Sequence, residues 1–101
     1  MGPLYASMKK VKGKIILSFH GVGKGLLVKE RHGEHHFLIA GNDKIFKKAV
    51  IKIEKEKIVV AHPEIAQPAA VRYCWSNTEE GTLFNKDGFP ATSFRTDEWE
   101  E

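Results

Sequence analysis

Short runs of alternating apolar and polar residues occupy most of the chain, and glycine, proline or charged residues separate them. The alternation has a period of two, which is typical of β-strands that bury one face. Valine, isoleucine and aromatic residues are frequent in the runs and favour strands over helices. The pattern predicts seven strands, at residues 14–19, 26–30, 35–40, 44–46, 49–54, 57–61 and 70–75.

Seven short strands joined by turns in 101 residues indicate one all-β domain. Strands at this spacing suit two packed sheets, so the predicted fold is a β-sandwich. Immunoglobulin-like and galactose-binding-like topologies both fit, and a small barrel is the alternative architecture. We place the sandwich core at residues 4–76 and expect an irregular C-terminal arm at residues 77–101.

The last predicted strand places Val71, Tyr73 and Trp75 on one face, which we expect to be the core face. Cys74 lies on the other face and is expected to be a small buried hydrophobe. As the only cysteine, it forms no internal disulfide.

Composition narrows the class of protein. The chain is 42% hydrophobic and 29% charged, which is typical of a folded globular domain rather than a disordered one. No apolar window approaches the roughly 20 residues that a membrane span needs, and the first residues do not resemble a signal peptide. The net charge of +3 comes from lysines interleaved with acids, so binding of single-stranded nucleic acid by a basic barrel is a weak alternative.

Two local patterns could carry chemistry. His32, His35 and His36 lie close together in sequence, but adjacent strand residues point to opposite faces, so we expect a polar turn and strand edge rather than a metal site. The glycine loop at residues 20–25 lacks the spacing of a phosphate-binding loop, so we expect a turn between two strands. We predict no metal and no cofactor.

Two C-terminal motifs resemble a known family. They are V-R-Y-x-W-x-N at residues 71–77 and L-F-N-x-x-G-F-P-A-x-x-F-R-T-D at residues 83–97. Together with G-P-L-Y, F-x-x-V-G-x-G-L and F-x-I-A-G, which begin at residues 2, 19 and 37, they resemble the C-terminal end of the sialate O-acetylesterases. The resemblance implies a periplasmic or secreted parent esterase whose SGNH-type hydrolase domain precedes this β-domain.

The residues that carry catalysis in that family have no counterpart here. Its serine block resembles G-Q-S-N and its histidine block D-x-H-P, and neither occurs in the chain. His62 precedes a proline, but Val60 stands where the family has aspartate. We therefore expect that the chain alone is not an enzyme and has no catalytic residue.

The arm keeps large apolar side chains that a polar loop does not need, so we interpret it as a docking arm for the catalytic domain of the same parent chain. We expect Phe84, Phe89 and Phe94 to be more exposed than Tyr73 and Trp75. Arg72 and Arg95 either reach across the boundary or form ordinary salt bridges within the domain. The candidate interdomain contacts are Arg72, Phe84, Phe89, Phe94 and Arg95.

A carbohydrate-binding module is the alternative function. In that case exposed tryptophans would stack on sugar rings of a glycan, and the candidates are Trp75 and Trp99. The shared face of Tyr73 and Trp75 instead favours a core position for both.

Overall fold

Ten short β-strands form the regular structure of this computed structural model, which describes residues 2–75 and 80–99. The strands are β1 (Leu4–Val11), β2 (Lys14–His20), β3 (Leu26–Val28), β4 (Phe37–Ala40), β5 (Lys47–Lys48), β6 (Val50–Glu54), β7 (Lys57–Ala61), β8 (Ala70–Tyr73), β9 (Leu83–Asn85) and β10 (Phe94–Arg95). The all-β prediction is confirmed. None of the described residues belongs to a helix that could cross a membrane.

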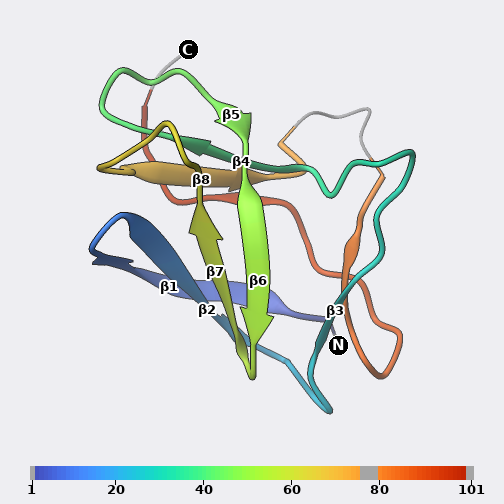
Figure 1. Cartoon of the computed structure of the whole chain (residues 1–101). Coiled ribbons are helices and arrows are strands. Elements are labelled where there is room, and N and C mark those ends of the chain that lie inside the picture. The colour runs from blue at the N-terminus through green and yellow to red at the C-terminus, as the bar shows by residue number, and fades with distance from the viewer. Residues whose placement is uncertain (1, 76–79, 100–101) are drawn as a thin grey trace.

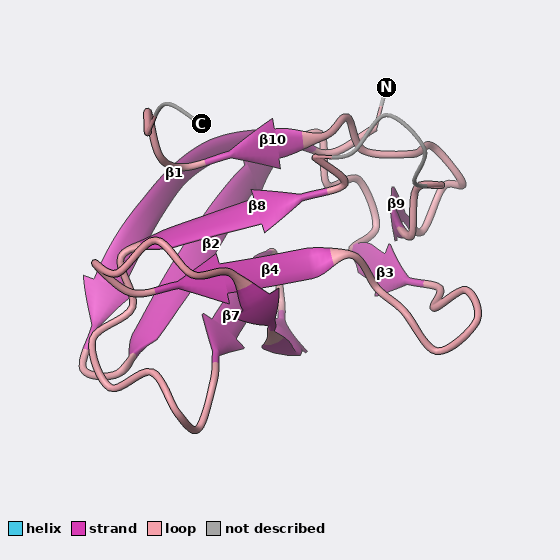
Figure 2. Ribbon diagram, turned by 90° about the horizontal axis from the view of Figure 1, so that it is seen from above, coloured by secondary structure: helices cyan, strands magenta, loops and turns pink. Residues whose placement is uncertain are grey.

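The strands form two four-stranded antiparallel sheets and one separate pair (Figure 1). The first sheet has the order β1-β2-β7-β6, and the second sheet has the order β10-β8-β4-β5. Strands β3 and β9 pair with each other beside the two sheets, and we call them the β3–β9 ribbon (Figure 2). The two larger sheets lie one over the other, which confirms the β-sandwich.

The core lies between the two sheets and follows the period-two pattern of the sequence. Ile15, Leu17, Ile58 and Val60 are fully buried on the inner face of the first sheet. The strand registers place Ile15 opposite Val60 and Leu17 opposite Ile58. The second sheet contributes the fully buried side chains of Phe37, Ile39, Val71 and Tyr73.

Strand β1 is absent from the sequence prediction. It pairs with β2 at the edge of the first sheet, and its register shifts between Tyr5 and Ser7. The shift puts Tyr5 and Met8, three residues apart, against the core, so the period of two is lost. The lysines of β1 stay in solvent and protect this edge from pairing with another chain.

The predicted strand at 44–46 is wrong, and the second sheet is instead extended by β5. A carboxylate oxygen of Asp43 accepts the backbone N–H of Ile45 at 3.0 Å, and Lys44 has a φ of 64°. A side-chain turn of this kind removes residues 43–45 from the sheet.

The chain crosses from the second sheet to the first at Ala49, between β5 and β6. The Ala49 N–H donates to the Phe37 carbonyl at 3.0 Å, and the Ala49 carbonyl is 2.8 Å from Nε2 of His35. Both backbone groups of this buried residue are therefore satisfied, one by β4 and one by the side chain of His35 just before it. Beyond the crossing, residues 55–56 form a hairpin turn between β6 and β7, as the gap between the predicted strands at 49–54 and 57–61 implies, because Glu54 pairs with Lys57.

Candidate functional site

The C-terminal arm, residues 77–101, holds most of the candidate contact residues. Residues 77–79, 100 and 101 lie outside the described part of the chain. The described part forms β9, a turn at residues 85–88, a return beside β9 and then β10 at the edge of the second sheet. The arm thus passes first along the ribbon and then along the sandwich, and its apolar side chains enter two different environments.

Phe94 belongs to the core. Strand β10 pairs with β8 so that Phe94 lies opposite Tyr73, and its ring stacks on that of Tyr5 with centroids 4.9 Å apart. Only 8% of Phe94 is exposed. The expectation that Phe94 is more exposed than Trp75 is therefore wrong, because this part of the arm is a strand of the sandwich with an inward-facing side chain.

Trp75 lies outside the core, and 42% of it is exposed. Strand β8 ends at Tyr73, and Cys74 follows with a φ of 48°. This backbone conformation breaks the alternation, so Trp75 does not continue the face of Val71 and Tyr73. The expectation of a shared core face is wrong for Trp75. Cys74 itself is partly buried against the core.

Arg72 forms a buried ion pair within the chain. Its Nε donates to Oδ1 of Asp97 at 3.1 Å, and one terminal nitrogen donates to Oδ2 at 2.8 Å. The side chains of Arg72 and Asp97 are 10% and 3% exposed. The guanidinium carbon also lies 4.3 Å from the ring centroid of Phe46. Hydrogen bonding from Arg72 holds the pKa of Asp97 below its ordinary value.

Arg95 joins the two tryptophans on the outer side of the second sheet. Its guanidinium carbon lies 4.9 Å from the ring centroid of Trp75, and one terminal nitrogen donates to the Trp99 carbonyl at 3.2 Å. The Trp99 ring meets Phe46 edge to face with centroids 5.9 Å apart. Lys44 places its ammonium 5.5 Å from the centroid of Trp99. We call Trp75, Arg95 and Trp99 the tryptophan–arginine cluster.

The ribbon carries a second surface feature. Leu27 pairs with Phe84, and Phe84 forms a bridge with Pro90 on the returning chain, so these three residues lie side by side across three short segments. Leu27 is 37% exposed, Phe84 is half-buried and Pro90 is exposed. We call Leu27, Phe84 and Pro90 the apolar row. Phe89, in the adjoining turn, is 49% exposed.

The inner side of the ribbon is closely packed, and the buried Asn85 side chain there is hydrogen-bonded. Leu26 and Leu83, next to the row, are 3% and 0% exposed. Asn85, which is 2% exposed, donates to the Gly21 carbonyl at 3.1 Å and accepts from the backbone N–H groups of Asp87 and Phe89. This side chain ties the glycine loop to the arm. The expected turn role of residues 20–25 is confirmed by the Gly25-to-Val22 hydrogen bond of 3.0 Å.

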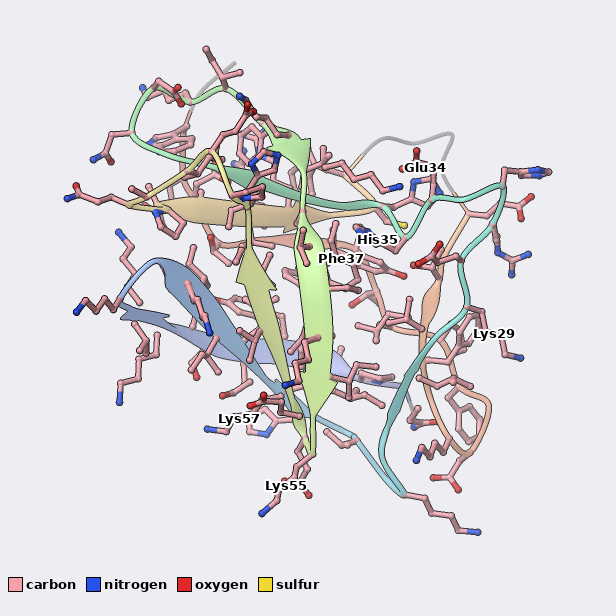
Figure 3. The ribbon with its side chains drawn as sticks, in the orientation of Figure 1. Lys29, Glu34, His35, Phe37, Lys55 and Lys57 are labelled. Carbon is pink, nitrogen blue, oxygen red and sulfur yellow. The ribbon has the colours of Figure 1, made fainter. Side chains whose placement is uncertain are left out.

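His35 has a structural position. Its Nδ1 accepts the backbone N–H of Phe37 at 3.0 Å, so Nε2 carries the proton that is donated to Ala49 (Figure 3). Burial lowers the pKa of His35, which favours the neutral ring. Within residues 2–75 and 80–99, no three His, Cys, Asp or Glu side chains are grouped to hold a metal ion.

Sequence reasoning missed several residues that shape these surfaces. The sequence pattern places Phe46 in a strand, and it shows Asp97 only as the last residue of a motif. Leu27 has no distinguishing neighbour in the sequence, since its partner Phe84 lies 57 positions later. Asn85 could have been noticed, because an asparagine followed three residues later by glycine is typical of a side-chain-stabilised turn.

A comparison with solved structures matches the chain to a carbohydrate acetylesterase from Xanthomonas citri. The match has a TM-score of 0.85 and 36% sequence identity, and it covers 96% of this chain. It covers 23% of the acetylesterase chain. No protein-family model and no curated protein matches the sequence.

The match covers nearly the whole chain, and its identity is higher than a shared fold alone requires. The match and the motif resemblance both indicate carbohydrate esterases. The match does not address specificity for sialate. This chain is therefore similar to a domain-sized part, spanning 23% of the length, of a carbohydrate acetylesterase.

Proposed function

We propose that this chain is an accessory C-terminal β-domain of a carbohydrate O-acetylesterase, where it braces an SGNH-type hydrolase domain and lines part of its substrate cleft. The observation that carries the proposal is the match to the X. citri acetylesterase, which has 36% identity over 96% of this chain. Because the match spans 23% of that enzyme, the comparison supports the proposal that this chain is one part of an esterase. The motif at residues 83–97 supports the finer proposal that the acetylated sugar is a sialic acid and that the parent is periplasmic or secreted.

In this proposal the domain by itself has no esterase activity. An acyl-transfer enzyme needs a nucleophile, a base and oxyanion donors placed together. His35, the buried histidine, has both ring nitrogens engaged by backbone groups. The isolated chain should therefore hydrolyse p-nitrophenyl acetate no faster than buffer does. Hydrolysis that is lost when Ser7, Ser18 or Ser93 is replaced by alanine would overturn this part of the proposal.

The bracing role is tested by exchanging domains. The matching segment of the X. citri acetylesterase is deleted in one variant and replaced by this chain in a chimaera. The proposal expects the deletion to lower the temperature at which esterase activity is lost and the chimaera to restore most of it. An unrelated β-sandwich of similar size, inserted at the same junction, is the control. Equal stability of the deletion variant and the parent enzyme would refute a bracing role.

One observation favours the alternative of a carbohydrate-binding module. Trp75 is 42% exposed, so part of it is accessible to a sugar, although the guanidinium carbon of Arg95 lies 4.9 Å from its ring centroid. Titration with acetylated sialosides or xylan fragments, followed by tryptophan fluorescence, tests this role. A saturable change that is lost in Trp75→Ala and kept in Trp99→Ala would support it. No change at millimolar sugar would leave the bracing role as the better explanation.

A further inference from the structure

The apolar row lies on the outer side of the β3–β9 ribbon, and the core of the chain does not need it. Leu26 and Leu83, beside the row, already bury the inner side of the ribbon. Leu27, Phe84 and Pro90 lie next to one another on the other side, in register across the three segments. Single exposed apolar side chains are normal on a protein surface, but a contiguous group is typical of an interaction site.

The row is held in place before any partner binds. Asn85 fixes the turn of the arm to the glycine loop through Gly21, and the Lys29 N–H donates to the Thr82 carbonyl at 2.8 Å. The Lys29 ammonium lies 5.5 Å from the centroid of the Phe84 ring, at the outer edge of the ribbon (Figure 3). A rigid surface loses little conformational entropy on binding, so this ribbon is suited to docking.

The start of the described chain lies against the same row. A Cβ atom added to Gly2 would clash with the carbonyl group of Pro90, so the backbones of these two residues are in direct contact. Pro3 is fully buried, which anchors this contact. A domain joined to the chain ahead of residue 2 would therefore be tethered next to Pro90.

The tryptophan–arginine cluster and the neighbouring Arg72 already make contacts with other residues of the chain. Arg72 is paired with Asp97, and the guanidinium of Arg95 covers one face of Trp75. At the apolar row, the Lys29 ammonium lies near the ring of Phe84. The side chains of the apolar row, by contrast, present apolar surface on the outer side of the ribbon.

We infer that the apolar row, with Phe89 at its border, is the surface on which the hydrolase domain of the parent esterase docks. This inference rests on the proposed function. It names one partner for the row, which is the hydrolase domain that the proposed function places ahead of Gly2. The match supports this choice, because a related enzyme joins the same fold to a chain several times its length. Docking would bury Leu27 and Phe84 against the hydrolase domain and displace the Lys29 ammonium toward solvent.

Hydrogen–deuterium exchange compares the isolated chain with the chimaera described above. The inference expects slower exchange in the chimaera at residues 26–29 and 83–90. Leu27→Lys and Phe84→Lys should abolish this protection and accelerate thermal loss of esterase activity by about tenfold or more. Each substitution removes a large apolar side chain that docking would bury. Val50→Lys is the matched control: Val50 is 60% exposed on β6, and its substitution should change neither readout.

The possible results separate the inference from the proposed function. Protection that instead appears at residues 44–46 and 95–99 would overturn the docking surface while keeping the bracing role. Two domains that unfold independently, with no protection anywhere, would overturn the proposed function itself. A dimer of the isolated chain in sedimentation, dissociated by Phe84→Lys and not by Val50→Lys, would make a second copy the occupant and overturn the choice made here.

A second measurement does not depend on the folding of the chimaera. Lysine is introduced into the intact X. citri acetylesterase at the positions aligned with Leu27 and Phe84, and separately at the position aligned with Val50. The inference expects faster thermal inactivation only for the first two variants. Equal inactivation of all three would overturn it.

Discussion

The phenolic oxygen of Tyr73 accepts the backbone N–H groups of both Thr82 and Leu83, each at 2.8 Å. Tyr73 ends β8 in the core, whereas Thr82 and Leu83 begin the ribbon part of the arm. Thr82 in turn donates its hydroxyl to the His35 carbonyl at 2.5 Å. All of these groups are buried, so one side chain links the sandwich to the segment that carries the candidate docking surface.

Replacing Tyr73 by phenylalanine should destabilise the chain by about 2–6 kcal/mol. The change removes one oxygen and leaves two buried N–H groups without their acceptor, each of which costs roughly 1–3 kcal/mol. Urea unfolding followed by circular dichroism measures the loss. Tyr5→Phe is the control for the same chemical change, because Tyr5 is only partly buried. Equal effects of the two substitutions would contradict the anchoring role of Tyr73.

Phe94→Ala and Phe89→Ala should differ strongly in stability. Phe94 is 8% exposed and stacks on Tyr5, so its truncation leaves a cavity and should cost about 3–5 kcal/mol. Phe89 is 49% exposed, so its truncation should change the free energy of unfolding by no more than about 0.5 kcal/mol. Thermal unfolding of the two variants checks the difference. Similar losses would show that the arm packs as a single unit.

The Arg72–Asp97 pair should make stability fall in acid. The folded-state pKa of Asp97 lies below its unfolded value because Arg72 stabilises the carboxylate. The contribution is therefore complete above the unfolded pKa of about 3.9 and is lost as the pH falls through the lower folded pKa. Asp97→Asn should show a smaller loss of stability below pH of about 4, and it should be less stable than the wild type at neutral pH.

The measurement for Asp97 is urea unfolding across a pH series. Glu98→Gln, next to Asp97 in the sequence and exposed, is the control and should keep the wild-type profile. A wild-type profile in Asp97→Asn would mean that the buried pair does not contribute to acid sensitivity.

His35 should make stability fall at higher pH than Asp97 does. Burial lowers the pKa of His35 in the folded state, and Lys48 acts in the same direction, whereas Glu30, Glu34 and the Ala49 carbonyl oppose the shift. The unfolded chain therefore takes up a proton first as the pH falls below the ordinary value of about 6.5. Stability should be complete above this pH and should decrease from there down to the folded pKa.

His35→Gln should flatten the slope of stability against pH just below about 6.5. The substitution also removes a ring that bridges two backbone groups, so the comparison uses the slope rather than the absolute stability. His20→Gln, at the exposed end of β2, is the control. An unchanged slope in His35→Gln would show that another group is responsible.

Particular residues show how far the sequence alone could predict the fold. The alternation of Ile15, Leu17 and Phe19 with Ile16 and Ser18 predicted β2 and its buried face, and the gap between the predicted strands at 49–54 and 57–61 implied the turn at residues 55–56. Strand β1 was missed because its bulge shifts the alternation, and the strand expected at 44–46 is prevented by the Asp43 turn. Local backbone conformations of this kind leave only a weak trace in the pattern of apolar residues.

The candidate site depended more on partners that are distant in the sequence. The motif at residues 83–97 marked the arm as unusual and pointed to the carbohydrate esterases. It could not show that Phe94 faces inward while Phe84 faces outward, because that depends on pairing with β8 and β3 respectively. Nor could it assign Arg72 to Asp97, which lies 25 residues away.

The sequence by itself determined the class of fold, the composition of the core and the presence of an unusually apolar arm, because these follow from the local periodicity of side chains. The tertiary structure alone decided that the arm is divided, with one part filling the sandwich and the other presenting Leu27, Phe84 and Pro90 to solvent. Burial of an apolar side chain depends on which distant strand it pairs with, and that pairing is a property of the whole folded chain.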